Sequence, residues 1–210
     1  MQFLIENIPE NTKKSTVLLY SKIKTKSIPW NETKGTSYAE AKELMYKMMK
    51  VCLEDDGIGL SAPQLGIYKQ LFIIRDLDES NTPKNSFTAY FNPTWSAVQA
   101  EGKETDVEGC LSVPNATIEV ERWKTINLNW LSLQEDGTFK KQSATFSGYM
   151  ARIIQHESAH LRAKSIVDDG KSISEINGNR QAKKFALDNK QTMANTKAKG
   201  NVQGARPKYS

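Results

Sequence analysis

The two histidines of this 210-residue chain stand four positions apart, within the run His156-Glu157-Ser158-Ala159-His160. Positions i and i+4 lie on one face of a helix, so both imidazoles can bind the same metal ion. Glu157 would then lie close to a metal-bound water, where a general base is needed. The alternative is a chance pattern on a surface helix. Apolar residues at 150, 153, 154 and 161 favour a buried helix, and with it the metal site.

A catalytic site of this kind needs a third protein ligand, because three ligands leave the fourth tetrahedral position to water. Cys, Asp and Glu residues are the candidates. Cys110 stands in the run Glu108-Gly109-Cys110-Leu111-Ser112, where Gly109 lets the backbone approach closely. A lone cysteine is also often a small buried apolar residue. We interpret Cys52, on the apolar face of a predicted helix, in that second way.

A glycine-rich stretch is the third element, with the sequence Gly57-Ile58-Gly59-Leu60-Ser61-Ala62-Pro63-Gln64. Alternating glycines remove side chains from one face of an extended segment. The backbone of a peptide ligand can then lie against that face and pair as an added strand. The alternative is a glycine-rich loop without a binding role, and this stretch alone does not distinguish the two.

Together the three elements resemble the peptide deformylase family. Its motifs are Gly-apolar-Gly-apolar-Ala-Ala-Pro-Gln, Glu-Gly-Cys-Leu-Ser and Gln-His-Glu-x-Asp-His, in that order. This chain carries them at 57–64, 108–112 and 155–160, with Ser61 in place of the first alanine and Ala159 in place of the aspartate. The resemblance covers about residues 36–170 and implies a catalytic domain there. Residues 1–35 resemble the family only weakly, and residues 171–210 form a basic tail.

The resemblance implies that Cys110, His156 and His160 bind one divalent metal ion. This is Fe²⁺ in the cell, with Zn²⁺, Ni²⁺ or Co²⁺ possible in preparations. The implied reaction is hydrolysis of the N-formyl group of formyl-methionine on new polypeptides, with release of formate. The metal lowers the pKa of its bound water from 15.7 to about 7. Glu157 would act as general base and then acid, and the Gln64 amide and the Leu111 backbone N–H would stabilise the oxyanion.

The resemblance also implies substrate-binding residues. Ile58, Gly59 and the backbone of Glu108 and Gly109 would bind the peptide as an added strand. Tyr149 and Arg152 stand where the family usually has aliphatic pocket residues, and both are candidates to line the substrate cleft. Arg152 could instead extend to solvent with only its stem packed.

The replacement at Ala159 has a consequence for Arg122. In the family the aspartate at this position is a buried partner of an arginine of the kind seen at Arg122. Here Arg122 needs another partner or solvent. Losing a residue that supports a metal ligand commonly costs about 10–100-fold in metal affinity or activity. We interpret the change as tuning, since all three ligands and Glu157 remain.

Two helices and five strands would position these residues. Apolar residues at helical spacing predict helices over 39–53, with Ser37 and Glu40 as a capping box, and over 149–162. Buried or alternating patterns predict strands at 70–77, 87–93, 116–122, 126–130 and 139–146. A polar loop is expected at 79–86, a strand end at Pro93 and a hairpin turn at Asp136-Gly137. We expect an α+β fold, with largely antiparallel sheets around a central helix that bears the His-Glu-x-x-His motif.

Charge is concentrated in the tail. Residues 171–210 hold nine of the 29 Lys and Arg residues but only two of the 24 Asp and Glu residues. A helix near 178–193 could contact ribosomal RNA, while the alternative is a solvated or disordered end. No pattern of interleaved aromatic residues supports specific RNA recognition, and specific DNA binding is not expected.

The location follows from composition. No apolar run approaches the roughly 18 residues that a membrane span needs, and no secretory signal is evident. Two cysteines suit a reducing compartment. We therefore expect a cytoplasmic protein, in a bacterial-type or phage-infected cell, with formylated peptides and nascent chains as partners and no membrane association.

Two other functions remain open from the residues. A zinc-dependent endopeptidase would need a third His or Glu ligand downstream, and Glu175 is the only such acid there. A catalytically weakened, deformylase-like binding protein would have lost activity through the change at Ala159.

Overall fold

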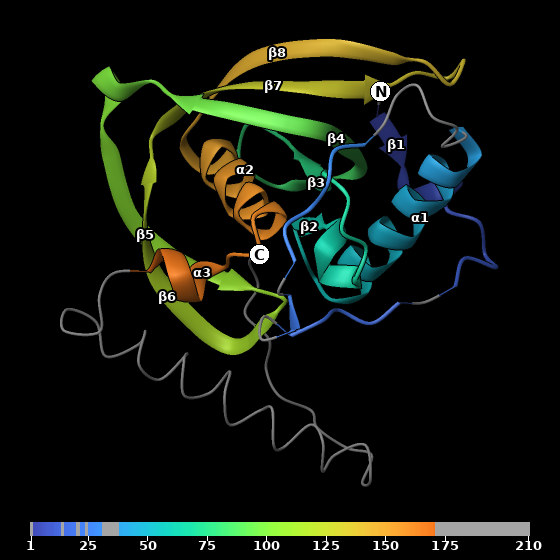
Figure 1. Ribbon diagram of the computed structural model, residues 1–210, viewed down its shortest axis with the longest axis horizontal. Coiled ribbons are helices and arrows are strands. Elements are labelled where there is room, and N and C mark those ends of the chain that lie inside the picture. Colours follow the sequence, from blue (N-terminus) through green and yellow to red (C-terminus); the bar gives the residue numbers. More distant parts are fainter. Residues whose placement is uncertain (1, 14, 20–21, 24, 31–37, 171–210) are drawn as a thin grey trace, which may run out of the picture.

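The computed structural model describes residues 2–13, 15–19, 22–23, 25–30 and 38–170. These residues form a six-stranded antiparallel sheet in the order β2-β3-β4-β7-β8, with β1 paired to β4, and a second sheet of β5 and β6 (Figure 1). Mainly antiparallel sheets with few helices are what the predicted α+β class requires. The capping residue Ser37 and the predicted tail helix at 178–193 lie outside the described residues.

Eight strands and a few helices make up this part of the chain. None of its helices is both long enough and apolar enough to span a membrane. In chain order the elements are β1 (Gln2–Leu4), η1 (Ile5–Asn7), α1 (Tyr38–Glu54), β2 (Gly59–Ser61), η3 (Ala62–Leu65), β3 (Leu71–Leu77), β4 (Pro83–Ala97), η4 (Gln99–Glu101), β5 (Lys103–Cys110), β6 (Val113–Trp123), β7 (Thr125–Leu133), β8 (Phe139–Ser147), α2 (Gly148–Leu161) and α3 (Ile166–Asp169).

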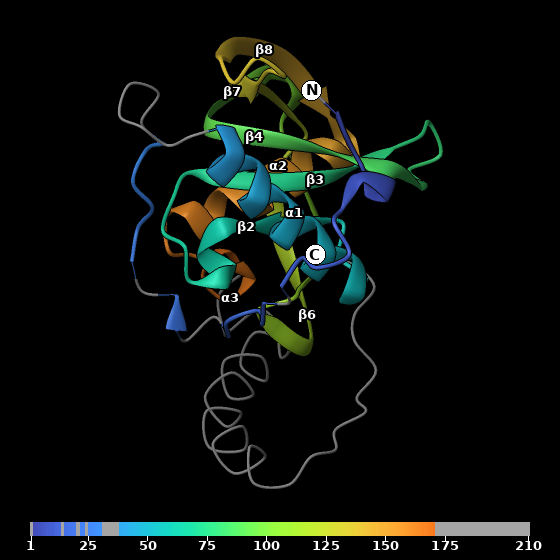
Figure 2. The same ribbon diagram turned by 90° about the vertical axis from the view of Figure 1, so that its right-hand side faces the viewer.

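Strand β3 is buried on both faces. Leu71 and Ile73 pack into the cluster that contains the apolar face of α1, whereas Phe72 and Ile74 pack into the cluster that contains α2. A strand covered on both sides needs apolar residues at every position, which explains the continuous run seen in the sequence. Figures 1 and 2 show α1 and α2 as separate helices near this part of the sheet.

The predicted helices at 39–53 and 149–162 and the five predicted strands are confirmed, but the end of the second strand was wrong. Strand β4 continues through Pro93 to Ala97, and its first residues, 83–86, occupy half of the predicted loop. The pairing register shifts between Phe91 and Thr94, and Asn92 adopts a left-handed backbone with φ of 46°. A proline is tolerated at such a bulge because no ladder hydrogen bond is needed from it.

Helix α2 is buried along nearly its whole length, since every residue from 151 to 161 is buried. In Figure 1 it lies between the six-stranded sheet and the β5–β6 pair. Buried polar side chains require hydrogen-bond partners. Gln155 meets this requirement by accepting from the Trp123 backbone N–H at 3.0 Å and donating to the Trp123 carbonyl at 2.8 Å. This pair of bonds joins α2 to the end of β6.

We expect Phe72→Ala to lower the free energy of unfolding by about 3–5 kcal/mol, because it removes a fully buried ring from the α2 side of β3. Denaturant unfolding followed by circular dichroism measures the change. Leu4→Ala, at a side chain that is 41% exposed, is the control and should change stability by less than about 0.5 kcal/mol. Equal losses in the two variants would contradict this description of the core.

Candidate metal centre and active site

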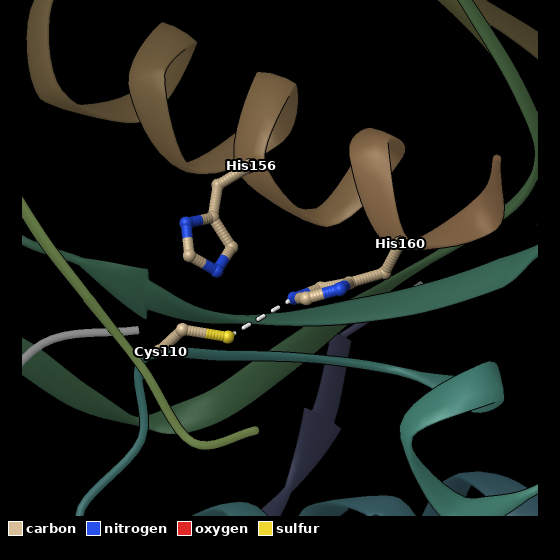
Figure 3. Close-up of side chains that lie close together, drawn as sticks. All are labelled: Cys110, His156 and His160. Atoms are coloured by element: carbon tan, nitrogen blue, oxygen red, sulfur yellow. Dashed lines mark hydrogen bonds between the residues drawn. The ribbon is translucent and has the colours of Figure 1, made fainter. Parts of the chain in front are cut away.

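Cys110, His156 and His160 converge on one buried point. Cys110 is the last residue of β5, and both histidines project from α2 toward it (Figure 3). One potential ligand atom from each residue lies within 4.8 Å of the others, and the Cys110 Sγ is 3.3 Å from the His160 Nε2. The three candidate ligands therefore meet, although Cys110 is 50 positions away from His160 in the chain.

The donor set fits a divalent transition metal. Ligand atoms held at about 2.0–2.3 Å from a tetrahedral ion lie roughly 3.3–3.6 Å apart, close to the observed sulfur–nitrogen separation. The Nε2 of His156 is buried and has no hydrogen-bond partner among the described residues. Burial holds the pKa of His160 well below its usual value, whereas the interactions of His156 with Cys110 and Glu108 outweigh burial and raise the pKa of His156. These residues could hold a metal ion.

Glu108 orients the first of the two histidines. Its Oε2 lies 3.0 Å from the His156 Nδ1, and Arg122 binds both carboxylate oxygens, at 3.0 and 2.9 Å. Burial alone would raise the pKa of Glu108, but the hydrogen bonds from His156 and Arg122 outweigh it and hold that pKa well below its usual range. An ionised carboxylate only accepts hydrogen bonds, so the Nδ1 donates and the Nε2 faces the other two candidate ligands.

Arg122 finds another partner in place of an aspartate at position 159. Arg122 binds Glu108 through two hydrogen bonds, and in addition its Nη1 donates to the Asp169 Oδ2 at 2.6 Å. Asp169 ends the short helix α3, which follows α2 in the chain. The first of the two expectations for Arg122, a different partner, is therefore confirmed, and Ala159 leaves this buried cation paired.

Arg152 does not extend to solvent, so that expectation was wrong. It is 4% exposed, and its Nη1 donates to the Glu108 Oε1 at 2.8 Å and to the Val120 carbonyl at 3.0 Å. Its head group thus lies in the same charge network as Arg122. Tyr149, in the first turn of α2, is half-buried and packs against the apolar cluster around that helix. A role of either residue in the substrate cleft stays a prediction.

Glu157 is fully buried beside the glycine-rich stretch. Its Oε2 accepts a 2.6 Å hydrogen bond from the Ser61 hydroxyl, and its Oε1 has no such partner in the described part of the chain. Burial raises the pKa of Glu157, against the lowering effects of His156 and Ser61. A Cβ on Gly59 would lie only 2.6 Å from the Oε1. The glycine in β2 is therefore required by the close approach of this carboxylate.

Gln64 connects the first motif to the second. Its Oε1 accepts from the Ser61 backbone N–H at 2.8 Å, and its Nε2 donates to the Ser112 hydroxyl at 3.1 Å. Both Gln64 and Ser112 are buried. Leu111, the second predicted oxyanion donor, lies directly between Cys110 and Ser112 in the chain. Leu111 thus directly follows a candidate metal ligand, and Gln64 binds the residue after Leu111.

Sequence reasoning missed several residues of this site. Ser61 was noted only as a departure from the family motif, yet its hydroxyl holds Glu157. Asp169 carried no signal, because an acidic residue after a helix is usually solvated. Ile58 lies directly before β2, Gly59 begins that strand, and Gly109 lies beside the register shift that precedes Cys110. Their role in substrate binding stays a prediction.

Comparison with known proteins gives the same family as the three motifs. Residues 16–175 match the family model described as polypeptide deformylase. The peptide deformylase of Microchaete diplosiphon is 40% identical over 131 residues, 61% of this chain and 65% of that protein. That of Synechococcus sp. strain CC9605 is 39% identical over 135 residues, 64% of this chain and 63% of that protein. The matches thus span just under two thirds of these relatives.

Comparison with solved structures also finds peptide deformylases. The crystal structure of a class I type b peptide deformylase from Acinetobacter baumannii, with Met-Ala-Ser bound, has a TM-score of 0.63 and 26% identity. The comparison covers 75% of this chain and 99% of that one. With its fold and its Cys-His-His group, this chain belongs to the polypeptide deformylase family.

We expect Gly59→Ala to lower the free energy of unfolding by about 1–3 kcal/mol, because the new methyl group displaces the Glu157 side chain from Ser61. Denaturant unfolding measures the loss. In the double variant with Glu157→Ala the obstacle is gone, so the cost of the glycine substitution should largely vanish. The same cost in both backgrounds would mean that Glu157 does not require the glycine.

Glu108→Gln should destabilise the protein by about 3–5 kcal/mol, because it leaves the buried cations Arg122 and Arg152 without their shared counter-charge. Urea unfolding gives the difference. The matched control is Glu121→Gln, whose 2.9 Å pair with Lys103 is exposed and should contribute less than about 1 kcal/mol. A similar cost in the two variants would contradict the buried network.

Proposed function

We propose that this protein is a metal-dependent peptide deformylase, which hydrolyses the N-formyl group of formyl-methionine on newly made polypeptides and releases formate. The observation that carries the proposal is the convergence of Cys110, His156 and His160 beside the buried carboxylate of Glu157. Membership of the family supports it, as does the peptide Met-Ala-Ser bound to the similar Acinetobacter baumannii enzyme.

Different residues of the site would bind the metal and transfer the proton. A metal ion bound by Cys110, His156 and His160 would act as a Lewis acid and lower the pKa of water. Glu157 takes a proton at its Oε1, while Ser61 holds the Oε2, and passes the proton to the leaving amine. Its raised pKa suits a group that must both accept and release a proton near neutral pH.

Two donors stabilise the charge that develops on the formyl oxygen. The Gln64 amide has two N–H groups and uses one on Ser112, so the second can donate to the substrate. The Leu111 backbone N–H supplies the other donor. Removing one donor of this kind typically costs about 10²–10³ in rate.

The substrate would bind as an added strand. Strand β2 stands at the end of the six-stranded sheet, with β3 as its neighbour, and the peptide would extend the sheet beside it. Ile58, Gly59, Glu108 and Gly109 would contribute their backbones, with the methionine side chain in an apolar pocket. Tyr149 is a candidate for that pocket.

The cellular setting belongs to the same proposal. We infer that residues 36–170 form the catalytic domain around the central helix α2, preceded by the segment 1–35. A thiolate and two imidazoles suit Fe²⁺ or Zn²⁺, and Fe²⁺ is the proposed metal in the cell, with Ni²⁺ or Co²⁺ as substitutes. The setting is the cytoplasm, where nascent chains are the partners and the basic residues of 171–210 could contact ribosomal RNA.

Formate release from formyl-Met-Ala-Ser, measured with Ni²⁺ or with Fe²⁺ under anaerobic conditions, tests the function. Glu157→Gln should reduce the rate by about 10²–10⁴-fold while the protein keeps its metal, because it removes the proton acceptor and leaves the three ligands unchanged. Glu119→Gln, at an exposed position of β6, should leave the rate unchanged.

Two results would replace the proposal. Cleavage of an unformylated peptide without formate release would favour an endopeptidase. Bound metal without any reaction in the wild type would favour a deformylase-like binding protein.

A further inference from the structure

Four charged side chains form one connected group behind His156, and the proposed mechanism uses none of them directly. Glu108 and Asp169 are acidic, and Arg122 and Arg152 are basic. Arg122 bridges the two acids, and Arg152 joins the group at the Glu108 Oε1. All but Asp169 are nine-tenths or more buried. The half-exposed carboxylate of Glu104 lies 3.8 Å from the Arg152 Nη2 at the rim of this group.

We propose that Arg152 is a positioning residue of the metal site, which acts on His156 through Glu108, and that Asp169 supplies the negative charge that allows a second arginine there. The proposal rests on the proposed function only in that both concern the same metal ligands.

The hydrogen bonds around Glu108 carry the argument. The Oε1 accepts from the Arg122 Nε at 3.0 Å and from the Arg152 Nη1 at 2.8 Å. The Oε2 accepts from the Arg122 Nη2 at 2.9 Å and faces the His156 Nδ1 at 3.0 Å. A carboxylate has about four lone-pair sites, so all of them are used. With Arg152 in place the carboxylate cannot turn without losing a bond, and the ring of His156 is held with it.

Arg152 is itself held in place by its position on α2 and by hydrogen bonds to the β5–β6 pair. It precedes His156 by four positions, so Arg152, His156 and His160 follow one another along a single face of α2. Its remaining donors bind two backbone carbonyls of the neighbouring sheet, those of Val120 at 3.0 Å and Glu104 at 3.2 Å. The guanidinium therefore fixes Glu108 relative to both the helix and the β5–β6 pair.

An effect of Arg152 through its charge and an effect through its positioning of Glu108 predict opposite changes in metal affinity when Arg152 is removed. A buried positive charge repels a divalent cation, and little water is present to weaken the repulsion. If Arg152 acted only through its charge, removing it would strengthen metal binding. If it acts by holding Glu108, removing it weakens metal binding, because His156 loses its fixed orientation.

Cobalt binding by the full-length protein, after chelator treatment, tests the proposal. Arg152→Met keeps an unbranched side chain of similar length, and we expect its Co²⁺ dissociation constant to rise about 10–100-fold, with a changed visible absorption spectrum. Arg152→Lys keeps the charge but loses the planar guanidinium with its several donors. It should therefore bind Co²⁺ more tightly than the methionine variant and less tightly than the wild type. Arg162→Met removes the same charge from an exposed position just after α2, and should leave the spectrum unchanged.

An unchanged or lower dissociation constant in Arg152→Met, with the wild-type spectrum, would overturn the proposal. If that variant does not fold, Arg152→Lys decides, because it keeps the charge and loses the two-pronged guanidinium; a dissociation constant within twofold of the wild type would also overturn the proposal. Asp169 lies nearer the surface, and Asp169→Asn should weaken Co²⁺ binding severalfold; a value within twofold of the wild type would overturn the role proposed for Asp169. Formate release by the wild type is a separate readout, so the proposed function can fail while this inference holds, and the reverse.

Discussion

Three elements of this protein, β5, β6 and α2, meet at the carboxylate of Glu108. The residue belongs to β5, its arginine partners come from β6 and α2, and Arg122 extends the contact to α3 through Asp169. A buried carboxylate is costly unless its oxygens are bonded, so these elements must be in register together. The apolar cluster between the β5–β6 sheet and α3 is small, with six buried residues. Directional polar contacts therefore do much of what apolar packing does elsewhere in the fold.

The glycine-rich stretch reaches α2 by a second set of contacts. Ser61 holds Glu157, Gly59 leaves the space for its carboxylate, and Gln64 binds Ser112 in the segment after Cys110. Each of the three motifs thus contacts the other two through buried side chains. This explains why short runs about 45 residues apart in the chain can work as one site.

Much of this arrangement could be predicted from the sequence, because it depends on local patterns. Helical spacing gave both long helices, alternation gave β6 and β7, the Asp136-Gly137 turn gave β8, and the spacing of the histidines indicated the candidate metal ligands. Pro93 led to a wrong strand end, because a proline usually ends a regular strand. It is tolerated here at a bulge, and the bulge depends on the pairing with the neighbouring strand. The partners of Arg152 were also out of reach. A long side chain can extend to solvent or turn inward, and the carboxylate that decides this lies 44 positions earlier in the chain.

The burial of α2 has a consequence for the motions of the protein. Eleven consecutive residues of the helix are covered on all sides by strands and side chains. Local opening exposes amides only where a segment can leave its neighbours without disrupting the core. Because α2 cannot do so, its backbone amides should exchange with solvent deuterium only when the whole domain unfolds. The helix that carries His156 and His160 is therefore among the most rigid parts of the described chain, and any flexibility near these residues must come from the strands and loops around it.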